Sequence, residues 1–100
     1  MRLFGYFKGL PYGDCNESFE EYRGYKNALP KEKVYEHMNS LGKWRTSLPT
    51  HDIFTGEKLE AGLSIDGEFS FPLDFLHYYK NYDIGIPYDY EAYLRDEVGL

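Results

Sequence analysis

Apolar side chains recur along residues 31–41 at the spacing of one helix face. Val34, Met38 and Leu41 stand four and three positions apart, which places them in a single stripe. Pro30 suits the first position of this helix, because its missing N–H would have no partner there. Gly42 supplies a left-handed residue at which the helix can stop. The pattern predicts an amphipathic helix that begins at Pro30.

The segments on either side predict shorter elements. Residues 3–8 are rich in aromatic side chains and end at a turn over 9–13, which favours a first strand. Ser18 with Glu21 three residues later is a capping box, so we expect a helix from Phe19 to about Lys26. Residues 44–48 read as a strand, and residues 49–56 as a loop or broken hairpin.

Asp66 and Gly67 mark the turn of a β-hairpin. A two-residue turn at Asp-Gly would mix apolar and polar positions on each face of the hairpin. A three-residue loop over 65–67, with Gly67 as the left-handed bulge, pairs Leu63 with Phe69 and keeps each face consistent. We therefore predict the bulged register, with the loop at 65–67.

Two helices are predicted in the C-terminal third. Pro72 begins one that runs to about Tyr82, and Asp74 in its first turn meets the positive end of the helix dipole. Both faces of this helix are apolar or aromatic, so it should be sandwiched between the sheet and another element. Pro87 begins the last helix, through residue 98, which we expect to provide that cover.

These elements predict an α+β fold in a single domain over residues 1–100. The sheet is small and mainly antiparallel, built from the N-terminal strand, the middle segment and the 60–71 hairpin, with three to four helices packed on it. Hydrophobic residues make up 42% of the chain and aromatic residues 19%. This composition supplies enough apolar surface for one core in a chain of this length.

Charge is distributed unevenly along the chain. The net charge is −6, but residues 1–50 carry +2 and residues 51–100 carry −8. Such a surface repels phosphate backbones and anionic lipid and attracts a basic partner. The start of the chain lacks a secretory pattern, and no stretch is long and apolar enough to span a membrane, so we expect a cytoplasmic protein. Cys15 is the only cysteine, which excludes an intrachain disulfide.

Signatures of catalysis or metal binding are absent from the sequence. His37, His51 and His77 are isolated from one another, without the short spacing that begins a zinc site. No phosphate-binding loop and no nucleophile elbow occurs. Acids beside aromatic rings are found in glycosidases, but a chain of 100 residues has little left to wall a cleft once its core is built. We therefore expect no enzyme, no cofactor and no metal.

Tyrosines and acids near the ends of the last two predicted helices are the candidate partner-binding residues. Tyrosine offers a large rigid contact area, and a neighbouring carboxylate suits lysine or arginine on a partner. The predicted site consists of Tyr82, Asp83, Tyr88, Asp89 and Glu91. Alternatively the tyrosines fill the core, and this reading applies most strongly to Tyr78, Tyr79, Tyr90 and Tyr93.

Several short motifs together resemble a group of small bacterial proteins. They are Gly5-Tyr6-Phe7, Tyr12-Gly13-Asp14, Asp66-Gly67, Phe69, Phe71-Pro72, Asp74-Phe75, Tyr78-Tyr79, Tyr82, Ile86-Pro87 and Tyr90. This chain has phenylalanine at 69 and 71, where the group more often has tryptophan. Some such small acidic proteins look like immunity proteins of interbacterial toxin systems, including contact-dependent inhibition.

The resemblance and the charge lead to one functional hypothesis and two alternatives. The first is a non-enzymatic immunity protein that neutralises a basic nuclease toxin through an acidic, tyrosine-rich face, without touching nucleic acid or membrane. The second is an acidic inhibitor of the anti-restriction or anti-CRISPR type that mimics nucleic acid. The third is a small enzyme, which would need a pocket with converging polar groups. The sequence predicts no oligomeric state.

Overall fold

A four-stranded sheet with helices on one face organises the protein. The computed structural model describes residues 1–7, 17–47 and 49–100. Within them the strands are ordered β1 (Arg2–Leu3), β6 (Phe69–Pro72), β5 (Gly62–Asp66) and β2 (Trp44–Arg45). β1 is parallel to β6, and the other pairs are antiparallel. The fold is α+β, as the sequence predicted, and its Cα radius of gyration of 12.8 Å is that of one 100-residue domain.

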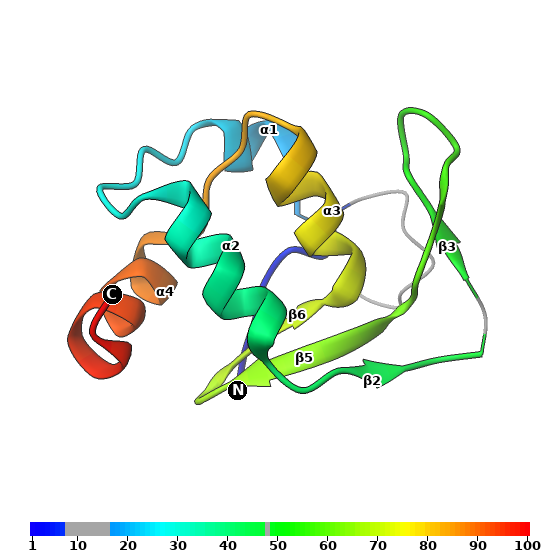
Figure 1. Ribbon diagram of the computed structural model, residues 1–100. Helices are drawn as coiled ribbons and strands as arrows, with labels where there is room; N and C mark the ends of the chain where they lie inside the picture. The colour runs from blue at the N-terminus through cyan, green and yellow to red at the C-terminus, as the bar shows by residue number, and fades with distance from the viewer. Residues whose placement is uncertain (8–16, 48) are drawn as a thin grey trace.

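A two-stranded ribbon extends from one end of this sheet. It consists of β3 (Thr50–His51) and β4 (Lys58–Leu59), which pair antiparallel. Figure 1 shows the ribbon reaching away from the helices at the far end of β2 and β5. The sequence left this region as a loop or broken hairpin, and the structure resolves it as a hairpin.

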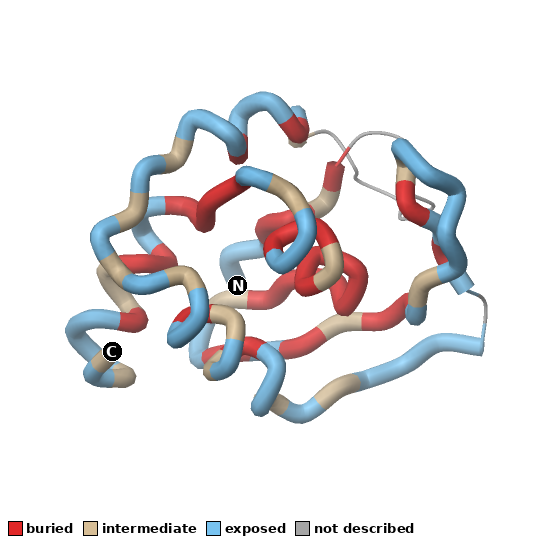
Figure 2. Tube along the Cα trace, turned by 45° about the horizontal axis from the view of Figure 1, so that its top comes forward, coloured by how far each residue is buried: buried red, intermediate tan, exposed pale blue. Residues whose placement is uncertain are grey.

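The helices lie together over one face of the sheet (Figure 1). They are α1 (Phe19–Arg23), α2 (Lys31–Ser40), α3 (Leu73–Asn81) and α4 (Tyr88–Tyr93), and α4 continues into a π-helical turn, η1 (Leu94–Val98). Figure 2 shows buried residues gathering on α3 and the strands beneath it. α3 is sandwiched as predicted, but its main helical neighbour is α2 rather than the last helix.

Aromatic rings fill the space between the sheet and the helices. Phe4 from the β1 segment lies 5.5 Å from Phe75 of α3 and 4.8 Å from Tyr90 of α4, measured between ring centroids. Phe7 contacts Tyr22 of α1 edge-on at 5.0 Å. These side chains are fully buried. The core therefore joins the two ends of the chain through ring contacts.

The helix boundaries confirm part of the sequence prediction. Ser18 caps α1, although its hydroxyl accepts from the N–H of Glu20 rather than that of Glu21. α2 begins one residue later than predicted, because Pro30 is its extended N-cap residue, and it buries Val34 and Met38 of the expected stripe. Gly42 does not have the left-handed conformation predicted for it, because the helix ends instead at Leu41 in an extended conformation. Cys15 and the predicted turn at 9–13 lie outside the described residues.

The register of the β5–β6 hairpin differs from the prediction. Asp66 pairs with Phe69 and Ser64 with Phe71, so the loop is the two residues Gly67 and Glu68. Only Gly67 has positive φ, at 62°, which is typical of a type II′ turn with glycine first. The prediction of a three-residue loop was wrong because it assumed that Asp66 would avoid the core.

Asp66 and Ser64 in fact face the helices. Both are buried, while Ile65 between them points to the other side of the sheet and is 37% exposed. Polar groups can occupy an interior when their hydrogen bonds are satisfied. The Ser64 hydroxyl donates to the carbonyl oxygen of Gly42, and Asp66 accepts three hydrogen bonds. Hydrogen bonding to neighbouring elements therefore decides the register of this hairpin.

Candidate functional site

Asp66 binds the hairpin to two helices through its carboxylate. His37 of α2 lies 2.8 Å from Oδ2 through Nε2, and the Tyr90 hydroxyl of α4 donates to the same oxygen at 2.7 Å. The Tyr93 hydroxyl donates to Oδ1 at 3.0 Å. Burial raises the pKa of Tyr90 strongly, and the adjacent Asp66 carboxylate raises it further. This cluster keeps the tyrosines as protonated donors.

Asp52 forms a second carboxylate cluster in the β3–β4 turn. Its Oδ1 accepts from the N–H groups of Phe54 and Thr55 at 2.7 and 3.0 Å. Its Oδ2 contacts His77 Nε2 at 2.7 Å and accepts from the Tyr82 hydroxyl at 2.8 Å. Burial alone would raise the pKa of Asp52, but these hydrogen bonds outweigh it and lower the pKa to about 2. Through its hydrogen bond to His77, the ionised carboxylate connects the ribbon to α3.

His77 lines a hollow of about 350 Å³ with Asp52, Glu57, Asn81 and Tyr82. The hollow is open to solvent rather than enclosed. Nε2 of the His77 ring contacts Asp52, and Nδ1 of the same ring lies 3.3 Å from the side-chain amide nitrogen of Asn81. Both ring nitrogens are thus in contact with protein groups, an arrangement that holds the histidine in place.

Glu91 forms a third cluster, and its position changes the predicted partner site. It is only 6% exposed. One oxygen accepts from the N–H groups of Ala28 and Leu29 at 2.6 and 3.0 Å, and the other from the Asn27 amide at 3.1 Å. Burial favours a higher pKa, but the hydrogen bonds prevail and the pKa of Glu91 is lowered. Glu91 therefore anchors the loop before α2 and does not lie on the surface that a partner could touch.

The other four predicted residues fall into two groups. Tyr82 is half-buried, and its hydroxyl is committed to Asp52, whereas Asp83 next to it is exposed. Tyr88 is 53% exposed and packs edge-on against Tyr25, with ring centroids 5.0 Å apart. Asp89 is exposed and paired with Arg2 at 3.0 Å. The structure leaves Asp83, Tyr88 and Asp89 accessible from the predicted set.

The surface of residues 83–100 is acidic. Its exposed charged side chains are one base, Arg95, and four acids: Asp83, Asp89, Asp96 and Glu97. The pair between Asp89 and Arg2 is solvent-exposed, and such pairs contribute at most about 1 kcal/mol. Asp89 can therefore exchange Arg2 for a basic group on another molecule. We call these four acids with Tyr88 the acidic surface.

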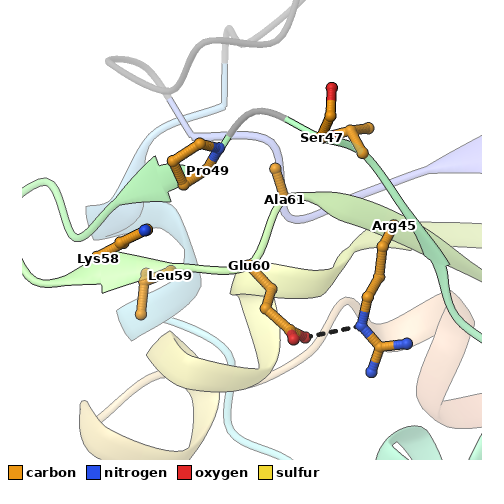
Figure 3. A pocket seen from close by; sticks show the side chains of 8 residues that line it. Arg45, Ser47, Pro49, Lys58, Leu59, Glu60 and Ala61 are labelled. Carbon is orange, nitrogen blue, oxygen red and sulfur yellow. Dashed lines mark hydrogen bonds and ion pairs between the residues drawn. The ribbon is translucent and has the colours of Figure 1, made fainter.

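A second hollow, of about 360 Å³, lies where the ribbon leaves the sheet (Figure 3). Arg45 and Glu60 pair at 3.1 Å on one side of it, and Pro49, Ala61 and Lys58 line other parts (Figure 3). No motif in the sequence singled out these residues. The hollow is open, and its lining includes no buried charged side chain.

Metal and membrane sites can be assessed on the described part of the chain. No group of three or more histidine, cysteine or acidic side chains there could hold a metal ion. None of the helices in residues 1–7, 17–47 and 49–100 is long and apolar enough to cross a membrane.

The sequence reasoning missed Asp52 and Asp66 as key residues. Asp66 was assigned to a turn, and Asp52 to a loop, because aspartate is common in both. No spacing in the sequence marks a carboxylate whose side-chain partners lie 24 to 30 residues away. Comparison of the chain with protein-family models, with curated proteins and with solved structures finds no match.

Proposed function

We propose that the protein is a non-enzymatic inhibitor that binds and neutralises a basic toxin domain in the cytoplasm, in the manner of an immunity protein. The observation that carries the proposal is the acidic surface: residues 83–100 expose four acids, one base and the ring of Tyr88. Long-range attraction between opposite charges speeds association, and aromatic rings supply contact area at the centre of an interface.

The interior supports a binding role over a catalytic one. The buried tyrosines are packed among phenylalanine rings, and the acids that converge on histidines are already hydrogen-bonded within the protein. The hollow beside His77 is open rather than enclosed. Chemistry would require a group that is free to move a proton, whereas these groups serve to hold elements together.

The test uses the product of a toxin gene found beside the gene for this protein. Binding is measured by calorimetry at 50 and 500 mM salt, and protection by growth of cells that express the toxin domain. We expect tight binding that weakens with salt, and survival of the protected cells. A variant with Asp83→Lys, Asp89→Lys and Asp96→Lys should weaken binding at low salt by about tenfold or more.

A matched variant controls for net charge. Glu32, Glu36 and Glu57 are also exposed but lie on α2 and in the ribbon. Reversing these three changes the net charge by the same amount and should leave affinity within about threefold, since only long-range attraction is altered. Equal loss in both variants would contradict a defined docking surface. Absence of binding and of protection would contradict the proposed function itself.

A further inference from the structure

Arg2 forms an ion pair that joins the acidic surface to the other end of the chain. Its Nε donates to Oδ2 of Asp89 at 3.0 Å, across 87 residues of sequence. Its Nη1 donates to the carbonyl oxygen of Leu3 at 2.6 Å. Burial disfavours the charge of Arg2, but the hydrogen bond and the charge of Asp89 outweigh it and raise the pKa of Arg2. The guanidinium therefore stays charged and spans two acceptors.

Both acceptors are held in place by the fold. β1 is an edge strand of the sheet. The N–H groups of Arg2 and Phe4 donate to β6, so the carbonyl group of Leu3 between them points away from the sheet. The other oxygen of Asp89 accepts the N–H of Tyr90 at 3.0 Å, which leaves Oδ2 for Arg2. A guanidinium from another molecule would find the same two acceptors.

This pair of acceptors favours arginine over lysine. A guanidinium is a rigid planar fork whose Nε and Nη donors reach separate acceptors, whereas lysine presents one compact ammonium group. The exposed ring of Tyr88 is next to Asp89 on α4 and packs edge-on against Tyr25. Burial mainly raises the pKa of Tyr25, and the charges of Arg2 and Asp89 also act on it, so these rings lie near the site. Arginine packs well against aromatic rings.

We propose that Arg2 is the internal occupant of an arginine-binding site on the acidic surface, and that an arginine of the basic partner replaces it in the complex. The inference rests on the proposed function and adds to it the partner's side chain and a self-inhibitory contact. The side chains of Arg2 and Asp89 are 41% and 52% exposed. An exposed pair changes an equilibrium constant by at most about fivefold, so a partner can displace Arg2. Removing the Arg2 side chain should therefore strengthen partner binding by about two- to fivefold.

A short peptide tests the site without a toxin. The probe is acetyl-Gly-Arg-Gly-amide, titrated to about 20 mM and followed by NMR, since one side chain at an exposed site binds weakly. In Arg2→Gln, the amide signals of Leu3 and Asp89 should shift with this peptide and shift less with acetyl-Gly-Lys-Gly-amide. With Asp89→Asn added, they should not respond. Absence of a response in Arg2→Gln, or equal responses to the two peptides, overturns the proposal.

Affinity for the toxin domain tests the displacement of Arg2. The matched control is Lys58→Gln, which removes the same charge from an exposed residue of the ribbon, at the other end of the molecule from α4 (Figure 1). Arg2→Gln should bind about two- to fivefold more tightly than Lys58→Gln, and the two should bind equally once Asp89→Asn is added to each. Thermal unfolding verifies that each variant is folded.

The outcomes separate this inference from the proposed function. If the parent binds the toxin domain but Arg2→Gln binds no more tightly than Lys58→Gln, the proposal is overturned and the proposed function stands. If the parent does not bind, the proposed function is overturned together with the partner's part in this proposal. The peptide titration still decides whether the site takes arginine.

Discussion

Replacing Asp66 tests most sharply how the hairpin is held. In Asp66→Ala, the hydroxyl of Tyr90 loses its acceptor inside the core, where Tyr90 has no exposed surface. A hydrogen bond to a charged group contributes about 1.5–3 kcal/mol, and a buried donor without a partner costs about 1–3 kcal/mol. His37 and Tyr93 are partly exposed and can turn to water. We expect the free energy of unfolding to fall by about 3–5 kcal/mol.

Urea unfolding followed by circular dichroism measures this loss. Combining Asp66→Ala with Tyr90→Phe removes the unpaired hydroxyl. The free energy of unfolding of the double variant should therefore fall by less than the sum of the two single-variant losses, with a difference of at least about 1 kcal/mol. Glu68→Ala is the control, because Glu68 is exposed in the same turn, and it should change stability by less than about 0.5 kcal/mol. A similarly small effect of Asp66→Ala would refute the role of this carboxylate.

Three further predictions follow from the other clusters and the turn. The pKa of Asp52 in the folded protein, about 2, is below its ordinary value of 3.8. The stability that this carboxylate contributes should therefore be complete above pH 4 and lost as the pH falls towards 2. Asp52→Asn should lower the free energy of unfolding at pH 7 by about 1–2 kcal/mol and make it depend less on pH in this window. Glu91→Gln should increase hydrogen exchange at the Ala28 amide, measured by NMR, without weakening partner binding by more than about threefold. Gly67→Ala should lower the melting temperature, because φ is 62° and a Cβ would lie 2.7 Å from the Tyr93 hydroxyl oxygen; an unchanged melting temperature would contradict the turn geometry.

Local patterns in the sequence predicted the helices well. The stripe after Pro30 and the proline starts at 72 and 87 depend on neighbours within one or two turns, and the structure places α2, α3 and α4 accordingly. The fold class also followed from these elements. The last helix differed in detail, since it changes to π-helical geometry at Leu94.

Long-range hydrogen bonds could not be predicted in the same way. The predicted hairpin register was wrong because it placed Asp66 in the loop and Leu63 on the face of Phe69, whereas Asp66 is buried on that face and Leu63 lies on the other. Glu91 was assigned to a partner site because its amide partners at 28 and 29 are distant in sequence. Carboxylates become interior residues only when a fold brings donors to them.

Most of the tyrosines that the structure describes belong to the core or pack against it, and four of them donate hydrogen bonds to carboxylates. Burial raises the pKa of Tyr78 to about 12 and raises that of Tyr22, Tyr79 and Tyr90 still further. A spectrophotometric titration at 295 nm, with circular dichroism at each pH, tests this directly. We predict that these four phenols ionise only when the protein unfolds in alkali. Reversible ionisation of every tyrosine near pH 10, with the fold intact, would contradict the account.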